Sequence, residues 1–229
     1  MPQTITYRFF TSGEEKIIVD LVFDEATFRL LLPEDSPRPD WARLEHQQCP
    51  NCNFLDESDY CPAALAMACF LPAFSTHVSY EKAVVEVDMT NRVVVSKSTF
   101  QSGMASLMGL ILATSGCPRT RFLRPMARFH LPFSDERETV FRALSAWLLG
   151  QYVAAKAAGR PLALSLEELK DCYVELSAVN AALAERIRLV FSRDAALNAV
   201  IILDTFAMIA PENIEGGFED ILSAFATEG

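Results

Sequence analysis

The sequence predicts an α+β protein in which an N-terminal antiparallel sheet of hairpins precedes a C-terminal helical bundle. β-Branched and aromatic runs separated by turn residues dominate the first hundred residues, and long stretches with helical periodicity fill the second half. With 229 residues, 51% of them hydrophobic, the chain is large enough to bury a core. We expect residues 1–133 to form a strand-rich part with a cysteine loop and a buried helix. Residues 134–229 should form the bundle, and the two parts should pack as one globular unit.

Alternating apolar residues and turn signals place the strands. The expected strands are Ile5–Phe10, Lys16–Phe23, Thr27–Leu32, Ala83–Asp88 and Arg92–Ser98. The first two flank a turn at Gly13, where glycine supplies a positive φ. The third must end at the proline-rich segment 33–39, because proline removes a ladder donor. The last two form a hairpin around Thr90 and Asn91.

Helical periodicity and end signals place the helices. The expected helices are Pro62–Phe70, Gln101–Thr114, Asp135–Ala158, Ser165–Val190, Arg193–Ile209 and a short amphipathic segment, Phe218–Phe225. Residues 101–114 are small and apolar on all sides, which predicts a buried helix ended by Gly116 in the left-handed region. Ser165 and Glu168 have the spacing of a capping box. Pro211 should stop the helix before it.

Composition narrows the class of protein. A net charge of −10 argues against nucleic-acid binding. The N-terminal residues do not resemble a signal peptide, and the apolar stretch Ala195–Ala210 carries Asn198 and Asp204, so we expect a cytoplasmic protein without a membrane partner. The apolar second half makes a homodimer plausible. Six cysteines without a secretion signal favour metal or redox chemistry over a disulfide framework.

Four cysteines in Cys-Pro or C-x-x-C contexts are the sharpest chemical feature. Cys49 and Cys52 form a C-x-x-C pair, Cys61 follows in a polar loop, and Cys117 directly follows the buried helix. Four thiolates satisfy the closed tetrahedron of structural zinc. We therefore predict zinc ligation by these four residues, with His46 as an alternative fourth ligand.

Other chemistry for the same cysteines stays open. An iron–sulfur cluster also takes four thiolates, although the closely repeated spacing of ferredoxins is absent. Thiol-dependent redox chemistry is a further alternative, but C-x-x-C redox sites follow a buried strand and open a helix, and the residues before Cys49 are polar. Cys69 and Cys172 lie in apolar helical segments and are expected to be core residues.

A local excess of positive charge follows Cys117. Arg119, Arg121, Arg124, Arg128 and His130 fall within twelve residues of an acidic chain. Guanidinium groups recognise phosphate and carboxylate bidentately, so this loop is a candidate anion-binding site. The alternative is that the arginines pair with acidic side chains in the fold.

Four segments also resemble an uncharacterised bacterial family of conserved hypothetical proteins. They are Cys49–Cys52, Tyr60–Pro62, Thr114–Pro118 and Pro125–Phe133. The resemblance extends from about Cys49 to Asp204. It implies that these segments belong to one site, and it implies no catalytic role.

These observations predict a zinc-stabilised cytoplasmic binding or interaction module whose arginine-rich loop binds an anionic small molecule or an acidic protein segment. The alternatives are an iron–sulfur or thiol-dependent redox enzyme using the same cysteines, and a metal-free protein that binds an anionic ligand. No catalytic residues are assigned.

Overall fold

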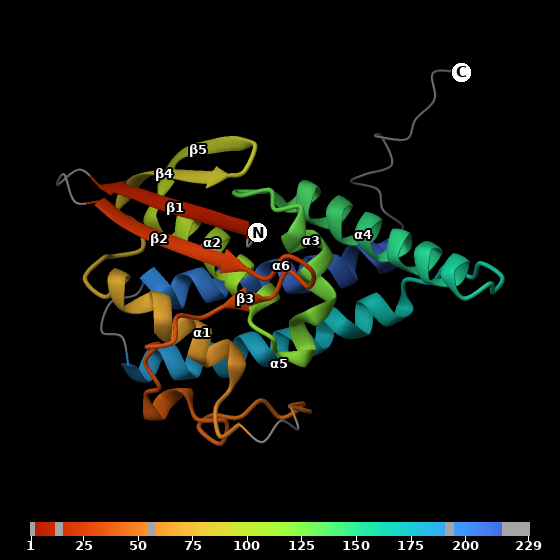
Figure 1. Ribbon diagram of the computed structural model, residues 1–229, viewed down its shortest axis with the longest axis horizontal. Helices are drawn as coiled ribbons and strands as arrows, with labels where there is room; N and C mark the ends of the chain where they lie inside the picture. Colours follow the sequence, from red (N-terminus) through yellow and green to blue (C-terminus); the bar gives the residue numbers. More distant parts are fainter. Residues whose placement is uncertain (1–2, 12–15, 55–57, 191–194, 217–229) are drawn as a thin grey trace.

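The computed structural model describes residues 3–11, 16–54, 58–190 and 195–216. Within them, five strands form one antiparallel sheet in the order β3-β2-β1-β4-β5, followed by helices (Figure 1). The strands are β1 (Gln3–Thr11), β2 (Lys16–Phe23), β3 (Leu30–Leu31), β4 (Lys82–Met89) and β5 (Arg92–Thr99). The predicted α+β class is confirmed.

Alternation along each strand gives the sheet one buried and one polar face. Ile5, Tyr7 and Phe9 of β1 are buried, and Tyr7 lies between Val19 of β2 and Val87 of β4. The opposite face carries ion pairs and hydrogen bonds between strands, as expected where every second side chain meets water.

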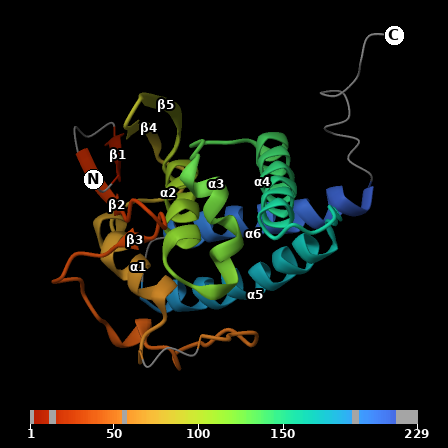
Figure 2. The same cartoon turned by 45° about the vertical axis from the view of Figure 1, so that its right-hand side comes forward.

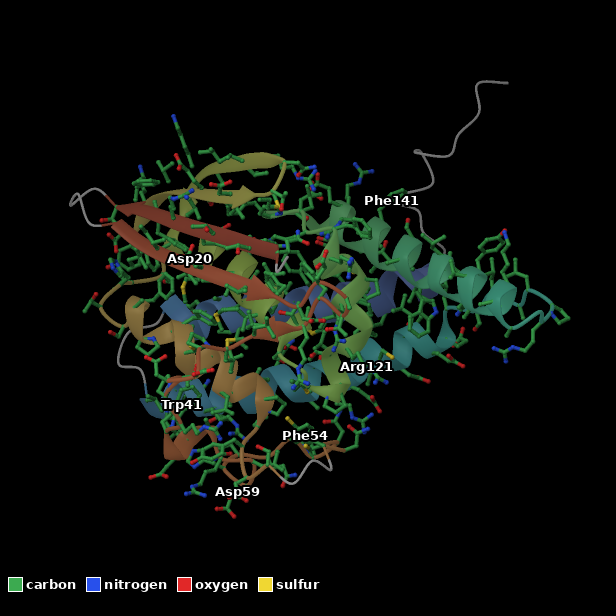
Figure 3. The ribbon with its side chains drawn as sticks, viewed as in Figure 1. Asp20, Trp41, Phe54, Asp59, Arg121 and Phe141 are labelled. Carbon is green, nitrogen blue, oxygen red and sulfur yellow. The ribbon has the colours of Figure 1, made fainter. Side chains whose placement is uncertain are left out.

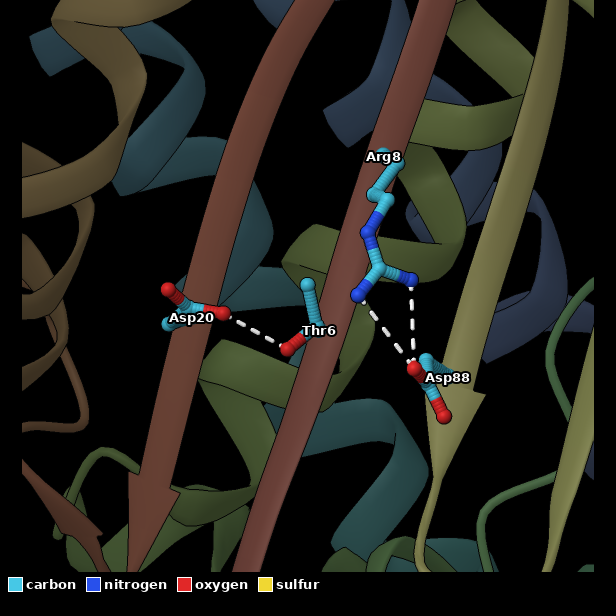
Figure 4. Close-up of polar contacts among 4 residues, drawn as sticks. All are labelled: Thr6, Arg8, Asp20 and Asp88. Atoms are coloured by element: carbon cyan, nitrogen blue, oxygen red, sulfur yellow. Dashed lines mark hydrogen bonds and ion pairs between the residues drawn. The ribbon is translucent and has the colours of Figure 1, made fainter.

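Figure 4 shows two of these polar contacts. Thr6 donates to a carboxylate oxygen of Asp20 at 2.6 Å, and both Nη atoms of Arg8 lie 3.2 Å from Asp88 Oδ2. Thr6 is directly opposite Asp20, whereas Arg8 reaches diagonally to Asp88, which is two residues from its direct partner Glu86. Both contacts help to fix the register of β2, β1 and β4.

The helices lie on the buried side of the sheet and beyond it. The α-helices are α1 (Pro62–Phe70), α2 (Phe100–Thr114), α3 (Arg124–Arg128), α4 (Glu136–Ala157), α5 (Glu167–Val190) and α6 (Ala195–Gly216), and the short 3₁₀ helices are η1 (Asp40–Ala42), η2 (Leu71–Phe74) and η3 (Pro118–Leu123). α2 packs against both the sheet and α6. η3 packs on α5. Helices from both sides of residue 133 therefore contact one another.

α2 is buried around nearly its whole circumference, as predicted, and it approaches the sheet closely at Gly103. A Cβ at Gly103 would lie 2.7 Å from the ring of Phe9 and 2.8 Å from Val85. The helix can therefore pack at this distance only because position 103 has no side chain. After Ser115, Gly116 has a φ of +97°, which confirms its predicted role at the end of the helix.

Three sequence expectations differ from the structure. The third strand is limited to Leu30–Leu31, because the preceding residues form a turn. α5 begins at Glu167, whose N–H lies 3.3 Å from Ser165 Oγ, and the capping box is found instead at Asp135 and Glu138 on α4. The Gly13 turn and Phe218–Phe225 lie outside the described residues.

The end of α6 is the third difference. The helix continues through Pro211 to Gly216, so proline does not stop it. Proline removes one N–H donor but leaves the rest of the ladder intact, and Asn213 Nδ2 donates to the carbonyl of Ile209 at 3.2 Å in the same turn. By length and composition alone, Ala196–Gly216 could cross a membrane, a test that core helices also pass. In this fold α6 packs on α2, α4 and α5.

Candidate functional site

The fold brings together the four cysteines selected from the sequence. Cys49 and Cys52 lie in one tight turn, in which Cys52 N–H donates to the Cys49 carbonyl at 3.0 Å. Cys61 occupies the N-cap position of α1 and is followed by Pro62. Cys117 occupies the N-cap position of η3 and is followed by Pro118. Each Cys-Pro step after the pair therefore opens a helix with proline in its first turn.

All four side chains line one cavity of about 20 Å³ between the cysteine loop, α1, η3 and α5. Space on this scale holds one atom of the size of a water or an ion. The loop, orange in Figure 1, lies beside α1 and α5 at the lower edge of the molecule. The cysteines are free thiols, and Cys69, Cys172 and His46 are not among the described residues that line the cavity.

The cavity also contains a side chain that the sequence did not single out. Arg186 of α5 is 1% exposed, and its guanidinium donates to the carbonyls of Trp41, Arg43 and Leu44 at 2.8, 2.7 and 3.2 Å. Burial lowers its pKa, and Cys61, Cys49 and Cys52 act in the opposite direction. Within the described parts of the chain, no carboxylate pairs with Arg186. Its hydrogen-bond partners are the three backbone carbonyls, and it shares the cavity with the four cysteines.

Burial disfavours the thiolate form of two of these cysteines. Burial raises the pKa of Cys49 to about 11, with further contributions from Cys61, Cys117 and Cys52. Burial likewise raises the pKa of Cys117. Among the described residues, no group of three or more His, Cys, Asp or Glu side chains has the arrangement of a metal site. The sulfurs line a common cavity without closing on a common centre.

The arginine loop separates into engaged and unengaged side chains. Arg119 donates to the Asn51 carbonyl at 2.7 Å and pairs with Glu175 at 2.5 Å. Arg128 donates to the carbonyls of Ala26 and Glu25 at 3.2 and 3.0 Å. Arg119 therefore pairs with an acidic side chain, as the alternative for this loop predicted, whereas Arg128 bonds to backbone carbonyls. Both arginines join segments of the fold.

Arg121 and Arg124 instead form a cluster with Arg29, which precedes β3. Within the described residues, none of the three guanidinium groups has a hydrogen-bond or ion-pair partner, and the buried Nε of Arg124 is left unsatisfied. Burial lowers the pKa of Arg124, and the charges of Arg121 and Arg29 lower it further. Figure 3 shows Arg121 on the surface near α5. We refer to Arg29, Arg121 and Arg124 as the guanidinium cluster.

The turn before β3 is built to place Arg29. Asp24 accepts hydrogen bonds from the Thr27 hydroxyl and N–H, and Phe28 has a φ of +55°, which is unusual for an aromatic residue. Stacking of Phe28 on Phe23, with centroids 4.4 Å apart, offsets that backbone strain. The Arg29 side chain then lies against Gly116, where a Cβ would be 2.6 Å from Nη2.

His130 belongs to the core. It is 9% exposed, and its Nε2 lies 2.6 Å from the Tyr7 hydroxyl, which also contacts Ser106 Oγ at 2.9 Å. Burial, with the charges of Arg142 and Arg92, lowers the pKa of His130 to about 3. A neutral imidazole adds no charge to an anion site.

Sequence reasoning missed Arg186 and Arg29, for which the sequence gives only weak signals. Arg186 follows Val179 and Leu183 at the spacing of the buried stripe of α5, so a charged residue at a core position was the available clue. Arg29 lies in a stretch read as a strand, and its relation to Gly116 depends on a long-range contact.

The fold is that of an α+β protein with a cysteine-lined cavity and a separate guanidinium cluster. The chain belongs to the family described as Domain of unknown function (DUF6901), whose family model matches residues 5–226. This match covers nearly the whole chain and extends on both sides of the stretch that carried the resemblance to an uncharacterised family. No curated protein and no solved structure matches the chain.

Proposed function

We propose that this protein is a zinc-stabilised binding module that holds a phosphate-type anion at the guanidinium cluster. The observation that carries the metal part is the convergence of Cys49, Cys52, Cys61 and Cys117 on one ion-sized cavity beside the buried Arg186. A buried guanidinium without a carboxylate needs negative charge nearby. Four thiolates around Zn²⁺ carry a net charge of about −2, which Arg186 partly neutralises.

Zinc binding requires the thiols to lose their protons and turn inward. Rotation about χ1 of each cysteine is the motion available for this. The metal would then join the loop that contains Cys49 to η3 and α1, and so hold the start of the arginine loop in place. The raised pKa of Cys49 opposes the thiolate that a redox nucleophile needs at neutral pH, whereas in ligation the charge of a bound Zn²⁺ would itself stabilise the thiolate.

Elemental analysis of the purified full chain tests the metal. We expect about one zinc per chain in the wild type, and loss of zinc together with a lower melting temperature in Cys52→Ser. Cys69→Ser is the matched control, because Cys69 lies outside the cavity, and it should retain the metal. Absorbance near ~400 nm with bound iron would favour the iron–sulfur alternative. Wild-type protein that neither contains nor takes up metal would overturn the zinc assignment.

The anion part rests on three guanidinium groups that repel one another and lack partners. Bringing like charges together costs free energy that an oxyanion between them would recover. The exposed Arg29 and Arg121 leave the cluster open to solvent, and the buried Arg124 Nε offers a donor to a small group. A phosphate, free or on a small molecule, fits this arrangement better than an extended acidic protein segment, whose backbone would keep its carboxylates farther from Arg124.

Calorimetric titration with inorganic phosphate at low ionic strength tests this site. Arg124→Gln and Arg121→Gln should each weaken binding about tenfold, since a charge-assisted hydrogen bond contributes ~1.5–3 kcal/mol. Arg160→Gln is the control, because Arg160 is exposed in the loop after α4 and its substitution removes the same charge away from the cluster. Equal affinities in Arg124→Gln and Arg160→Gln would remove the guanidinium cluster as the site. Phosphate binding by zinc-free protein would support the metal-free alternative.

A further inference from the structure

A larger cavity lies among the helices, apart from both polar sites. Its volume is about 220 Å³, and side chains from α2, α3, α4, α5 and α6 line it, most of them apolar. Figure 2 shows these helices grouped beside the sheet. An apolar cavity of ~150 Å³ is already large enough to bind benzene. The size and the lining therefore suit a small organic ligand, as in most ligand pockets.

One wall of the cavity carries a partly buried positive charge. Arg142 of α4 donates to Ser134 Oγ at 3.1 Å and to the carbonyls of Met126 and Phe129 at 2.8 and 3.2 Å. These bonds use three of the five N–H donors of a guanidinium. Over the described residues, Arg142 forms no ion pair with a carboxylate. Glu138, one turn earlier on α4, acts on the pKa of Arg142 in the direction opposite to burial, but the two remaining N–H donors of Arg142 are left for an acidic ligand group.

A second wall carries a buried polar group that lacks a partner. Asn180 of α5 is 1% exposed, and its Nδ2 makes only a long contact, 3.5 Å, with Asp204 Oδ1 of α6. Its Oδ1 accepts no hydrogen bond in the described structure. A buried amide oxygen without a donor costs free energy, so a ligand hydroxyl or N–H at this position would bind favourably.

The two polar walls are separated along α5. Tyr173, Leu176 and Asn180 of α5 all line the cavity, and Asn180 lies two helical turns beyond Tyr173. Seven residues of helix span about 10 Å. A ligand that reaches both walls therefore has an acidic end, an apolar body of about eight to ten carbon atoms and a hydrogen-bond donor at the far end.

We propose that this cavity binds a small hydroxylated carboxylic acid, with the carboxylate at Arg142, the apolar body between α2 and α6, and the hydroxyl donating to Asn180 Oδ1. The site is independent of zinc and of the guanidinium cluster. Neutral Ser106 and His130, which also line the cavity, leave Arg142 as the group that selects an anion.

The test is calorimetric titration of the full chain with 10-hydroxydecanoate and decanoate. We expect one molecule of either acid to bind per chain, with the hydroxy acid about tenfold tighter. Arg142→Gln should weaken both acids about tenfold or more. Arg137→Gln, an exposed arginine on the same helix that does not line the cavity, is the control and should bind like the wild type. In Asn180→Leu the preference for the hydroxy acid should disappear.

Because Arg142 also satisfies loop carbonyls, a second variant keeps the test decisive if Arg142→Gln does not fold. Ser102→Phe, at a half-buried position on the cavity wall, should fill the space and abolish binding in a folded protein. No binding of either acid to the wild type would overturn the proposal. So would equal affinities in Arg142→Gln and Arg137→Gln, a hydroxyl preference that persists in Asn180→Leu, or full binding by Ser102→Phe.

Discussion

Acidification should destabilise the protein through His130. Burial lowers the pKa of this histidine from 6.5 to about 3, so the folded state keeps the imidazole neutral while the unfolded chain takes up a proton below pH ~6.5. Between pH ~6.5 and ~3 the unfolded state therefore binds more protons, and the free energy of unfolding falls as the pH falls. Stability from this group is complete above pH ~6.5 and is lost toward pH ~3.

The magnitude follows from the size of the shift. Each pH unit below the unfolded pKa costs about 1.4 kcal/mol, so the contribution at pH ~4.5 is about 2–3 kcal/mol. That is a large fraction of the ~5–15 kcal/mol that separates folded from unfolded states. His130 Nε2 also forms a 2.6 Å hydrogen bond with the Tyr7 hydroxyl in the core. Any rearrangement that lets the folded state protonate His130 must also alter this bond.

Urea unfolding of the wild type and of His130→Gln at about pH 7 and pH 4.5 measures the effect. Glutamine keeps an acceptor for Tyr7 but does not titrate, so carboxylate contributions cancel when the two pH dependences are subtracted. The variant should lose about 2–3 kcal/mol less than the wild type over this interval. The same loss in both proteins would refute the assignment of a buried neutral imidazole at position 130.

Four further outcomes follow from the structure. Gly103→Ala should lower the free energy of unfolding by about 1–3 kcal/mol in urea titrations, because its Cβ would overlap the core beneath α2, and an unchanged midpoint would contradict that packing. Gly116→Ala should lower the free energy of unfolding by about 1–2 kcal/mol, because alanine is strained at this positive φ. It should also weaken phosphate binding by displacing Arg29, and normal phosphate affinity in this variant would show that Arg29 is not part of the site. In metal-free protein the raised pKa of Cys49 should make stability fall as the pH rises from ~9 to ~11, since the unfolded thiol ionises first, and thermal melts that are flat over this range would argue against its burial. Asp135→Ala should lower stability by about 1 kcal/mol through loss of the capping box on α4, measured against the wild type by thermal unfolding; no change would mean that the cap is not formed.

Local patterns account for much of the fold. The helix Pro62–Phe70 and the hairpin of β4 and β5 were predictable because proline placement, alternation and turn residues are properties of short segments. The burial of α2 followed from apolar residues on all its sides. The prediction that Pro211 stops the helix was wrong because a single proline is a local signal, whereas continuation of α6 depends on packing against α2 and α5.

The sites were predictable only in part. The Cys-Pro steps identified the cysteines that line one cavity, because the turn residues beside them leave a sequence pattern. Arg29, Arg186 and Asn180 have no such pattern, since their roles come from neighbours 87 to 145 residues away or from an unsatisfied atom. Conversely, Arg119 and Arg128 share the sequence context of Arg121 and differ from it only in the carbonyl and carboxylate groups that the fold places around them.

The bonds from Arg186 to the carbonyls of Trp41, Arg43 and Leu44 have a consequence for biosynthesis. These bonds link residues 142 to 145 positions apart, so the cavity around Cys49 and Cys61 cannot be closed until α5 has been made. At ~5–20 residues per second, about 6–25 s pass between synthesis of Cys61 and of Arg186. Throughout that interval Cys49 and Cys61 are not yet enclosed by α5, so the folding of this cavity is a late, long-range step in the synthesis of the chain.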